Sequence, residues 1–306
     1  MTLPEPAPAK IAATTDARDG LIVAIVCYLL WGFLPLLFHV LNDVGSITIV
    51  ADRTVCSLVV VGAILLLTRR WGEVGDAIRD PRTLRSMVIS SCLLATNWLI
   101  FVWAVETNQV IEASFGYFIN PLINVAIGMV LLGERQTRWQ TVAIAVAVVA
   151  ILMQAIGLGR IPWVALTLAL SFGFYGYFRK TAKVGSASGL FVETLVLTPI
   201  AIGYLVFTFI RDGGIGLHAD PGHLVLLLLT GPATAAPLLM FAFAVQRLRL
   251  TTIGMLQYMS PTISFLLAIV VFNEPINAVR LVSFGLIWVS LAIYTADSFF
   301  RRPRNA

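Results

Sequence analysis

The sequence predicts an all-α integral membrane protein with ten transmembrane helices in two inverted five-helix repeats. Three observations predict this fold class: an apolar composition, ten apolar windows of membrane-spanning length, and similarity between the two halves of the chain. Of the 306 residues, 58% are hydrophobic and 12% are charged, whereas a soluble domain carries about 25% charged residues. The mean hydropathy is +0.90. A chain of this composition is expected to lie in a lipid bilayer.

Ten apolar windows are long enough to be transmembrane helices, because about 20 helical residues cross a hydrocarbon core about 30 Å thick. We predict spans at 20–41, 46–68, 86–105, 111–132, 139–157, 161–178, 186–210, 223–245, 252–272 and 279–298. The first nineteen residues are rich in Pro and Ala, so we expect residues 1–19 to be a disordered cytoplasmic tail. Residues 299–306 follow the last span as a basic cytoplasmic tail.

Arginine and lysine predict the orientation of these spans. With the N-terminus in the cytoplasm, seventeen of the 21 basic residues fall in cytoplasmic segments, and only Arg160, Arg211 and Arg280 fall in outer segments. This asymmetry follows the positive-inside rule, so both termini are expected to be cytoplasmic. The cytoplasmic set includes Arg179, which we place in the loop after the sixth span. Because the basic residues are spread over many short loops, no nucleic-acid partner is expected.

The two halves of the chain match at an offset of 140 residues. The segment NPLINVAIGMVLLGE (120–134) aligns without a gap with SPTISFLLAIVVFNE (260–274), which pairs Pro121 with Pro261 and Glu134 with Glu274. Shared apolar composition explains matches of Leu, Val and Ala. It does not readily place a Pro thirteen residues before a Glu in both halves. The chain is therefore expected to contain an internal repeat.

The first repeat covers residues 20–157 and the second covers residues 161–298. Each repeat contains five spans, an odd number, so the second enters the membrane with the opposite topology. Inverted repeats of this kind are typical of secondary transporters that work by alternating access, with a site near the bilayer midplane where the repeats meet.

Arg53 and Glu193 are ionisable residues inside predicted spans, and they align with each other at the repeat offset. Arg53 lies about eight residues, or about 12 Å of helix, from the outer end of its span, and the inversion gives Glu193 a similar depth from the inner end. A charge at the bilayer centre costs at least about 2.5–3.5 kcal/mol, so such residues usually face a cavity or one another. We expect an Arg53–Glu193 pair, or two charges that line one central cavity.

Both charges have a structural alternative. In the alternative for Arg53, its side chain extends outward and anchors the helix at the membrane surface. In the alternative for Glu193, the residue is a protonated, hydrogen-bonded acid with a structural role. Asp52 is adjacent to Arg53 and points to a different face of the helix. It meets another helix or the outer water, and its partner is left open.

Other polar and aromatic residues suit the lining of a central cavity. They are Trp31, Asn97, Trp98, Tyr117, Asn120, Gln257 and Tyr258. Any single Trp or Tyr is more readily explained as a packing residue or an interface anchor. The expectation of a cavity therefore rests on the seven residues taken together. The aromatic run SFGFYGYF (171–178) at the end of the sixth span accompanies them.

Pro121 and Pro261 are expected helix breakers, because proline lacks the N–H of a helical residue and frees the carbonyl one turn earlier. Glu134 and Glu274 close the corresponding spans on opposite membrane faces. We expect both acids to hold helix ends or loop backbone, with a contact at a gate as the alternative.

The spans at 139–157 and 279–298 are largely apolar and are predicted to be peripheral. Ala143 and Ala147 have the small-residue spacing that lets two helices approach closely, so these spans are a candidate homodimer face. We expect no metal site and no cofactor.

Three segments resemble the EamA branch of the drug/metabolite transporter superfamily: LLWGFLP (29–35), NWLIFVWAV (97–105) and ASFGYFINPLIN (113–124), which is followed by LLGE. The resemblance covers residues 20–298 and implies a multi-pass carrier of the bacterial inner membrane, with several relatives exporting amino acids or small metabolites. In this family a His often precedes the Arg of the second span. Asp52 occupies that position here, which argues against a proton relay through a His.

We therefore expect a secondary transporter that moves a small metabolite, an amino-acid-like compound or a drug, as an exporter coupled to protons through Glu193. An intramembrane enzyme is the main rival class, but the spans contain no HExxH, no paired GxGD aspartates and no GxSx serine motif. The chain has no Walker A loop. A channel and a non-transporting scaffold remain as alternatives.

Overall fold

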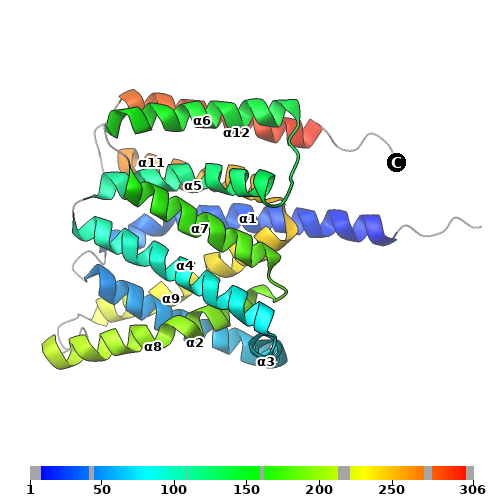
Figure 1. The fold of residues 1–306 in the computed structure, drawn as a ribbon. Helices are drawn as coiled ribbons and strands as arrows, with labels where there is room; N and C mark the ends of the chain where they lie inside the picture. Colours follow the sequence, from blue (N-terminus) through cyan, green and yellow to red (C-terminus); the bar gives the residue numbers. More distant parts are fainter. Residues whose placement is uncertain are drawn as a thin grey trace, which may run out of the picture.

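A computed structural model describes residues 8–40, 45–107, 109–158, 162–212, 221–271 and 278–300. These residues form helices and contain no strand, so the all-α prediction is confirmed for them (Figure 1). The helices are α1 (Pro8–Val40), α2 (Ser46–Leu67), α3 (Trp71–Arg79), α4 (Pro81–Glu106), α5 (Val110–Val130), α6 (Arg138–Leu158), α7 (Trp163–Thr181), α8 (Ser186–Asp212), α9 (Pro221–Arg247), α10 (Leu250–Gln257), α11 (Met259–Val270) and α12 (Ala278–Phe300).

Eight of these helices are long and apolar enough to cross a membrane, namely α1, α2, α4, α5, α6, α8, α9 and α12. The other two predicted spans correspond to α7 and to the successive helices α10 and α11. α7 is less apolar because it ends in Arg179 and Lys180, and α10 and α11 are each too short to span alone. The count of ten spans and the inverted relation of the halves remain predictions.

Three features of the helices differ from the prediction by more than a few residues. α1 begins at Pro8, so residues 8–19 are helical although a disordered tail was expected there. Alanine favours helix, and proline is accepted at the first helical position. The segment between the second and third spans contains the short helix α3. The single span predicted at 252–272 is interrupted at Tyr258, three residues before Pro261.

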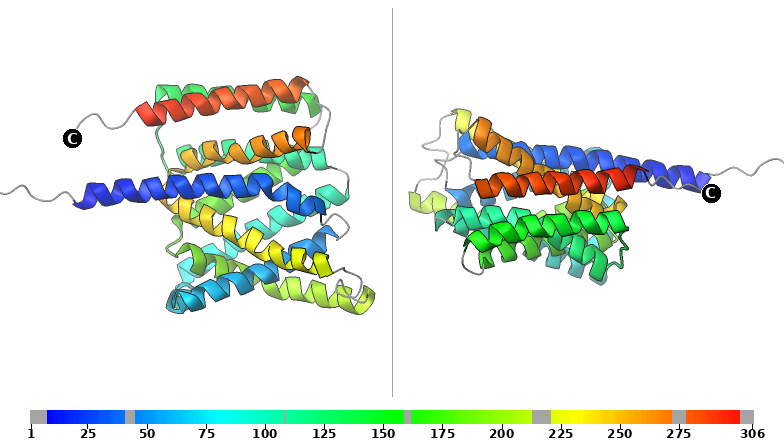
Figure 2. Two further views of the ribbon diagram at one scale, coloured as in Figure 1. Left: turned by 180° about the vertical axis from the view of Figure 1, so that it is seen from behind. Right: turned by 90° about the horizontal axis from the view of Figure 1, so that it is seen from above.

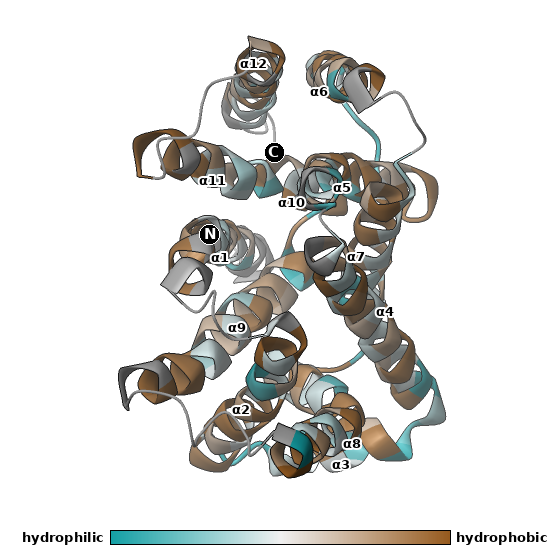
Figure 3. Cartoon of the chain, turned by 90° about the vertical axis from the view of Figure 1, so that its left-hand side faces the viewer, coloured by the Kyte–Doolittle hydropathy of each residue, from teal (hydrophilic) through white to brown (hydrophobic). Residues whose placement is uncertain are grey.

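The helices lie roughly side by side, and α6 and α12 form a pair at one margin of the bundle (Figures 1 and 3). These two helices pack chiefly against each other, with smaller contacts to α5 and α10. Ser290 Oγ donates a hydrogen bond of 2.6 Å to the carbonyl of Ala143. Ala143 and Ala147 are fully buried by this packing. Their small-residue face is therefore used within the chain, and a homodimer would need the outward faces of the pair.

The remaining helices bring the two halves of the chain into direct contact. α5 packs on α7 and α10, α4 packs on α7 and α8, and α2 packs on α8 and α9. The N-terminal end of α1, the C-terminal end of α12 and the short helix α3 lie at one end of the bundle (Figures 1 and 2). Glu73 of α3 accepts a 2.6 Å hydrogen bond from Ser188 in the first turn of α8. The first turns of α8 therefore lie at that same end.

Candidate functional site

Glu193 on α8 is fully buried, and its carboxylate lies at a junction of three helices. Its Oε1 lies 3.7 Å from Nη1 of Arg179 on α7 and accepts a 2.5 Å hydrogen bond from Ser90 Oγ on α4. Its Oε2 accepts a 3.3 Å hydrogen bond from the hydroxyl of Tyr175 on α7. The carboxylate is thus paired with a cation and hydrogen-bonded on both oxygens, which a buried charge requires.

Arg179 is also fully buried, which corrects its predicted place in a cytoplasmic loop. α7 continues as helix through this residue, so Arg179 lies one turn after Tyr175 on the same helix face. Its Nη2 donates to the carbonyl of Ser186 at 3.1 Å, and its Nη1 approaches the sulfur of Met87 at 3.5 Å. A buried cation beside Glu193 was missed because Arg179 was counted as a loop residue.

Arg53 on α2 does not pair with Glu193 in this structure. Its guanidinium carbon lies 4.2 Å from the centre of the Trp98 ring on α4, a cation–π contact. Tyr117 on α5 is within electrostatic range of the guanidinium and contacts Phe101 of α4, with 6.0 Å between the ring centres. In the described part of the chain Arg53 forms no ion pair, and its buried Nε has no hydrogen-bond partner.

Asp52 points to another helix. Its Oδ2 accepts a 3.0 Å hydrogen bond from Thr230 Oγ1 on α9, and its Oδ1 lies 3.8 Å from the sulfur of Cys56, one turn along α2. The two adjacent charges on α2 therefore serve different contacts, as expected for neighbours on a helix. The partner that the sequence left open is Thr230.

Trp31 belongs to a cluster of five aromatic rings. The cluster joins α1, α7 and α9 and consists of Tyr28, Trp31, Phe172, Tyr175 and Phe241. The centres of the Trp31 and Phe172 rings are 5.7 Å apart, and those of Tyr175 and Phe241 are 5.9 Å apart. Because Tyr175 also bonds to Glu193, the aromatic cluster is continuous with the buried ion pair.

Tyr117, Asn120 and Asn124 share one face of α5, because they are three and four residues apart. Asn124 Nδ2 donates a 2.7 Å hydrogen bond to Gln257 Oε1 on α10. Within the described residues, the buried Oδ1 atoms of Asn120 and Asn124 have no hydrogen-bond partner. Tyr117 keeps 42% of its surface exposed. This face is polar and incompletely satisfied, unlike the apolar packing around it.

Two other predicted site residues lie apart from the charges. Tyr258 is fully buried in the separate apolar cluster between α5, α6 and α12, which includes Val125 and Ile287. Asn97 joins α4 to α7, because its Nδ2 donates to the Leu168 carbonyl at 2.9 Å and to Ser171 Oγ at 3.1 Å.

Glu134 binds the beginning of α10. Its carboxylate accepts hydrogen bonds from the backbone N–H groups of Leu250 and Thr251, at 2.6 and 2.9 Å, and from the Thr251 hydroxyl at 2.7 Å. Its repeat mate Glu274 lies outside the described residues. α5 continues as helix through Pro121, whereas Pro261 follows the break between α10 and α11. Of the two expected helix breakers, only Pro261 accompanies an interruption.

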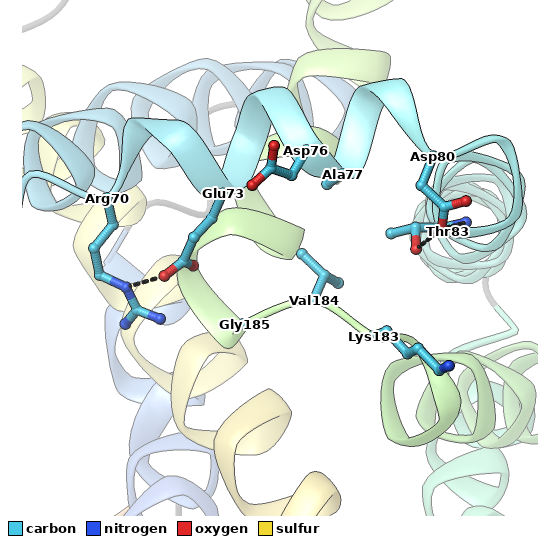
Figure 4. Close-up of a pocket in the computed structure, with 9 residues that line it drawn as sticks. All are labelled: Arg70, Glu73, Asp76, Ala77, Asp80, Thr83, Lys183, Val184 and Gly185. Carbon is cyan, nitrogen blue, oxygen red and sulfur yellow. Dashed lines mark hydrogen bonds and ion pairs between the residues drawn. The ribbon is translucent and has the colours of Figure 1, made fainter.

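A pocket of about 400 Å³ lies at the end of the bundle that carries α3. It opens between α3 and the segment that joins α7 to α8 (Figure 4). Its lining consists of Arg70, Glu73, Asp76, Ala77, Asp80, Thr83, Lys183, Val184 and Gly185. None of the sequence-predicted site residues lines this pocket. Among the described residues, no group of three His, Cys, Asp or Glu side chains is arranged to hold a metal ion.

A bundle of membrane-length helices with charged side chains between them defines a multi-pass membrane protein, in which such charges mark a functional site. The family model for EamA-like transporters matches residues 18–155 and again residues 160–296. The chain belongs to the EamA-like transporter family, which makes it a membrane transporter of the drug/metabolite type. The predicted family resemblance is confirmed.

Several curated relatives align with nearly the whole chain. "Protein RarD" of Streptomyces exfoliatus is 41% identical over 293 residues, which are 96% of this chain and 93% of the relative. "Protein RarD" of Escherichia coli is 38% identical, covering 95% of this chain and 98% of the relative. An "Uncharacterized transporter" of Vibrio cholerae is also 38% identical, covering 92% and 93%. A solved crystal structure shares the fold with a TM-score of 0.69 at 18% identity, covering 90% of this chain and 97% of that one.

Proposed function

We propose that the protein is a secondary transporter that exports a small metabolite, an amino-acid-like compound or a drug across the bacterial inner membrane. Ten spans in two inverted repeats, with α7 and the α10–α11 pair as the two less apolar spans, would move by alternating access. Both termini would face the cytoplasm. The single observation that carries this proposal is that Arg53 and Glu193 both lie between helices but, among the described residues, only Glu193 has a partner of opposite charge.

Arg53 is the proposed substrate-binding residue. The aromatic face of Trp98 stabilises a guanidinium only in part, by about 0.5–2 kcal/mol, so the cation retains a strong preference for an anion. A carboxylate or another electron-rich group of a substrate would meet this preference. The exposed surface of Tyr117 and the unfilled amide oxygens of Asn120 and Asn124 offer further polar contacts.

Glu193 is the proposed proton-coupling residue. Its hydrogen bond from Ser90 of α4 crosses between the two halves, and its hydrogen bond from Tyr175 joins α7 to α8 within the second half. A carboxyl group that alternates between charged and neutral forms would change these contacts as it binds and releases a proton. Proton binding and the rearrangement of the halves would then be linked.

The test is uptake by purified protein in proteoliposomes, with and without a pH gradient. The radiolabelled panel contains acidic, neutral and basic amino acids, a neutral sugar, and chloramphenicol, because a 28% identical relative of Pseudomonas aeruginosa is named "Chloramphenicol-sensitive protein RarD". Right-side-out and inside-out vesicles distinguish export from import. Saturable, gradient-dependent uptake of a carboxylate-bearing compound supports the proposal. Non-saturating flux points to a channel, and no flux for any compound points to a scaffold.

Arg53→Gln tests the binding role directly. Loss of a charge-assisted hydrogen bond is expected to raise KM for the transported carboxylate by about tenfold to 100-fold. Arg53→Lys should recover part of the affinity. Arg82→Gln, at an exposed position at the start of α4, is the matched control and should leave KM unchanged. An unchanged KM for Arg53→Gln would remove Arg53 from the site.

A further inference from the structure

We propose that Arg179 is a positioning residue: it is the internal counter-ion that competes with the proton for Glu193, and Gly189 provides the notch in which its guanidinium lies. This inference deepens the proposed proton-coupling role of Glu193 and rests on it. Arg179 lies on α7, and both Gly189 and Glu193 lie on α8, which the short segment 182–185 connects to α7.

Gly189 lies one turn before Glu193 on α8, so both residues face the same neighbour. A Cβ atom added to Gly189 would overlap Nη1 of Arg179 and would lie only 2.9 Å from its Cζ and 3.0 Å from its Nη2. The whole guanidinium therefore rests on the bare backbone of this glycine. Any side chain at position 189 would push the cation away from the carboxylate.

The surroundings of Glu193 leave Arg179 as its one cationic partner among the described residues. Arg179 and Tyr175 of α7 are the charged and titratable groups that face the carboxylate. α4 contributes the uncharged Ser90, and no titratable group of α2 or α9 in the described residues interacts with it. α3 packs on the same end of α8, but its acid Glu73 bonds to Ser188 instead.

The geometry allows the cation to remain when the proton arrives. The Ser186 carbonyl accepts a hydrogen bond from Nη2, independently of Glu193. Nε is buried without a partner in the described structure, so Nη1 and Nη2 make the polar contacts that hold the guanidinium. Protonation of Glu193 would remove its attraction for Arg179 and weaken the acceptor that Ser90 of α4 uses. The ion pair therefore sets the pH at which the α4–α8 contact changes.

The test follows the proton on Glu193 and needs no substrate. Infrared difference spectra of the protein in lipid vesicles report the C=O stretch of a protonated, buried carboxyl as pH is varied, and the band absent from the Glu193→Gln/Arg179→Gln double variant is assigned to Glu193. In Arg179→Gln the carboxyl should hold its proton to a higher pH, with the titration midpoint raised by about one pH unit or more. Arg179→Lys keeps the cation and should titrate near the wild type.

Gly189→Ala gives a second, independent test without any change in charge, since the methyl group should displace the guanidinium and raise the midpoint as Arg179→Gln does. Gly203→Ala is the matched control on the same helix, because nothing lies within 4 Å of a Cβ at that position, and its titration should equal that of the wild type. The inference would be overturned if the midpoint is unchanged in Gly189→Ala and in folded Arg179→Gln. It would also be overturned if Arg179→Lys shifts the midpoint as far as Arg179→Gln does.

The outcome is separable from that of the proposed transport function. If the Glu193 titration midpoint is raised in Arg179→Gln and Gly189→Ala but uptake does not depend on the pH gradient, proton coupling is rejected and the role of Arg179 as counter-ion is supported. Gradient-driven uptake that depends on Glu193, with unchanged midpoints, would reject only the role of Arg179. If Arg179→Gln fails to elute as a folded protein in size-exclusion chromatography, Gly189→Ala decides the question.

Discussion

The Arg53 guanidinium stacks on the indole of Trp98, with 4.2 Å between its central carbon and the ring centre. This contact joins α2 to α4 and places the cation against an aromatic face instead of a carboxylate. Glu193, the residue expected to pair with Arg53, is instead 3.7 Å from Arg179. The fully buried Arg179 and the half-buried Arg53 are therefore in different chemical situations. Arg179 has a carboxylate partner within the protein, and Arg53 has none among the described residues.

Double-mutant cycles should separate these two relationships. We expect Arg53→Gln and Trp98→Leu to couple by about 0.5–2 kcal/mol in the apparent free energy of unfolding, the size of a cation–π contact. Arg53→Gln and Glu193→Gln should instead be additive to within about 0.5 kcal/mol, because these residues share no contact. Denaturation in mixed detergent micelles measures both cycles. Strong coupling between Arg53 and Glu193 would restore the pairing predicted from the repeat.

Glu193→Gln should be less stable than the double variant Glu193→Gln/Arg179→Gln. The single change leaves the buried Arg179 cation without its carboxylate, and breaking a buried ion pair from one side typically costs about 3–5 kcal/mol. The double change removes both charges and should recover a large part of that loss. Thermal unfolding of the purified variants compares them. A single variant as stable as the double variant would show that Arg179 finds another partner. Transport studies of Glu193 therefore need the double variant as their control.

Glu134→Ala should destabilise the start of α10. Its carboxylate accepts from two backbone N–H groups at the first turn of that helix, and loss of such a cap costs about 1–2 kcal/mol. Glu134→Gln keeps one acceptor oxygen and should cost less. Amide hydrogen exchange at Leu250 and Thr251 locates the effect. Equal exchange in the wild type and Glu134→Ala would mean that the cap does not hold these amides.

Glu73 should make the stability of the protein sensitive to acid. Hydrogen bonds from Arg70 and from the Ser188 hydroxyl hold the pKa of the Glu73 carboxyl below its usual value of 4.5. Because the folded-state pKa is depressed, this group stabilises the fold above about pH 4.5, and the contribution is lost as the pH falls through the folded-state pKa. The unfolding temperature of the wild type should therefore fall more steeply below about pH 4.5 than that of Glu73→Gln.

Asp76→Asn is the matched control for this pH dependence. Asp76 lies on the same short helix and lines the same pocket (Figure 4), but its carboxylate accepts no hydrogen bond within the described residues. The unfolding temperature of Asp76→Asn should fall below about pH 4.5 as steeply as that of the wild type. If the unfolding temperature of Glu73→Gln falls just as steeply, the α3–α8 contact is not the acid-sensitive element.

Several features of the fold could be read from the sequence because they depend on local composition. Runs of apolar residues predict membrane-length helices, and most helix bounds lie within a few residues of the predicted ones. The motifs around Trp31, Asn97 and Tyr117 were sufficient to predict the family, which the match over both halves confirms. Asp52 and Arg53 were separated by helix geometry alone, because adjacent residues face different directions. α3 was missed because it is short and amphipathic, without the apolar length of a span.

The sequence by itself determined that the chain is an all-helical membrane transporter and that Arg53 and Glu193 lie within its helices. Only the tertiary structure decided which cation neutralises Glu193. The repeat aligned Arg53 with Glu193, but equivalent positions in two halves need not touch, because the crossing of α4, α7 and α8 decides which side chains meet. The residues around Arg179 are equally typical of the end of a helix and of a loop, so the sequence does not predict that the side chain is buried. Arg179 is buried because α7 packs against α8, where Gly189 leaves space for the guanidinium. Contacts between residues distant in sequence depend on the packing of whole helices, which local pattern does not encode.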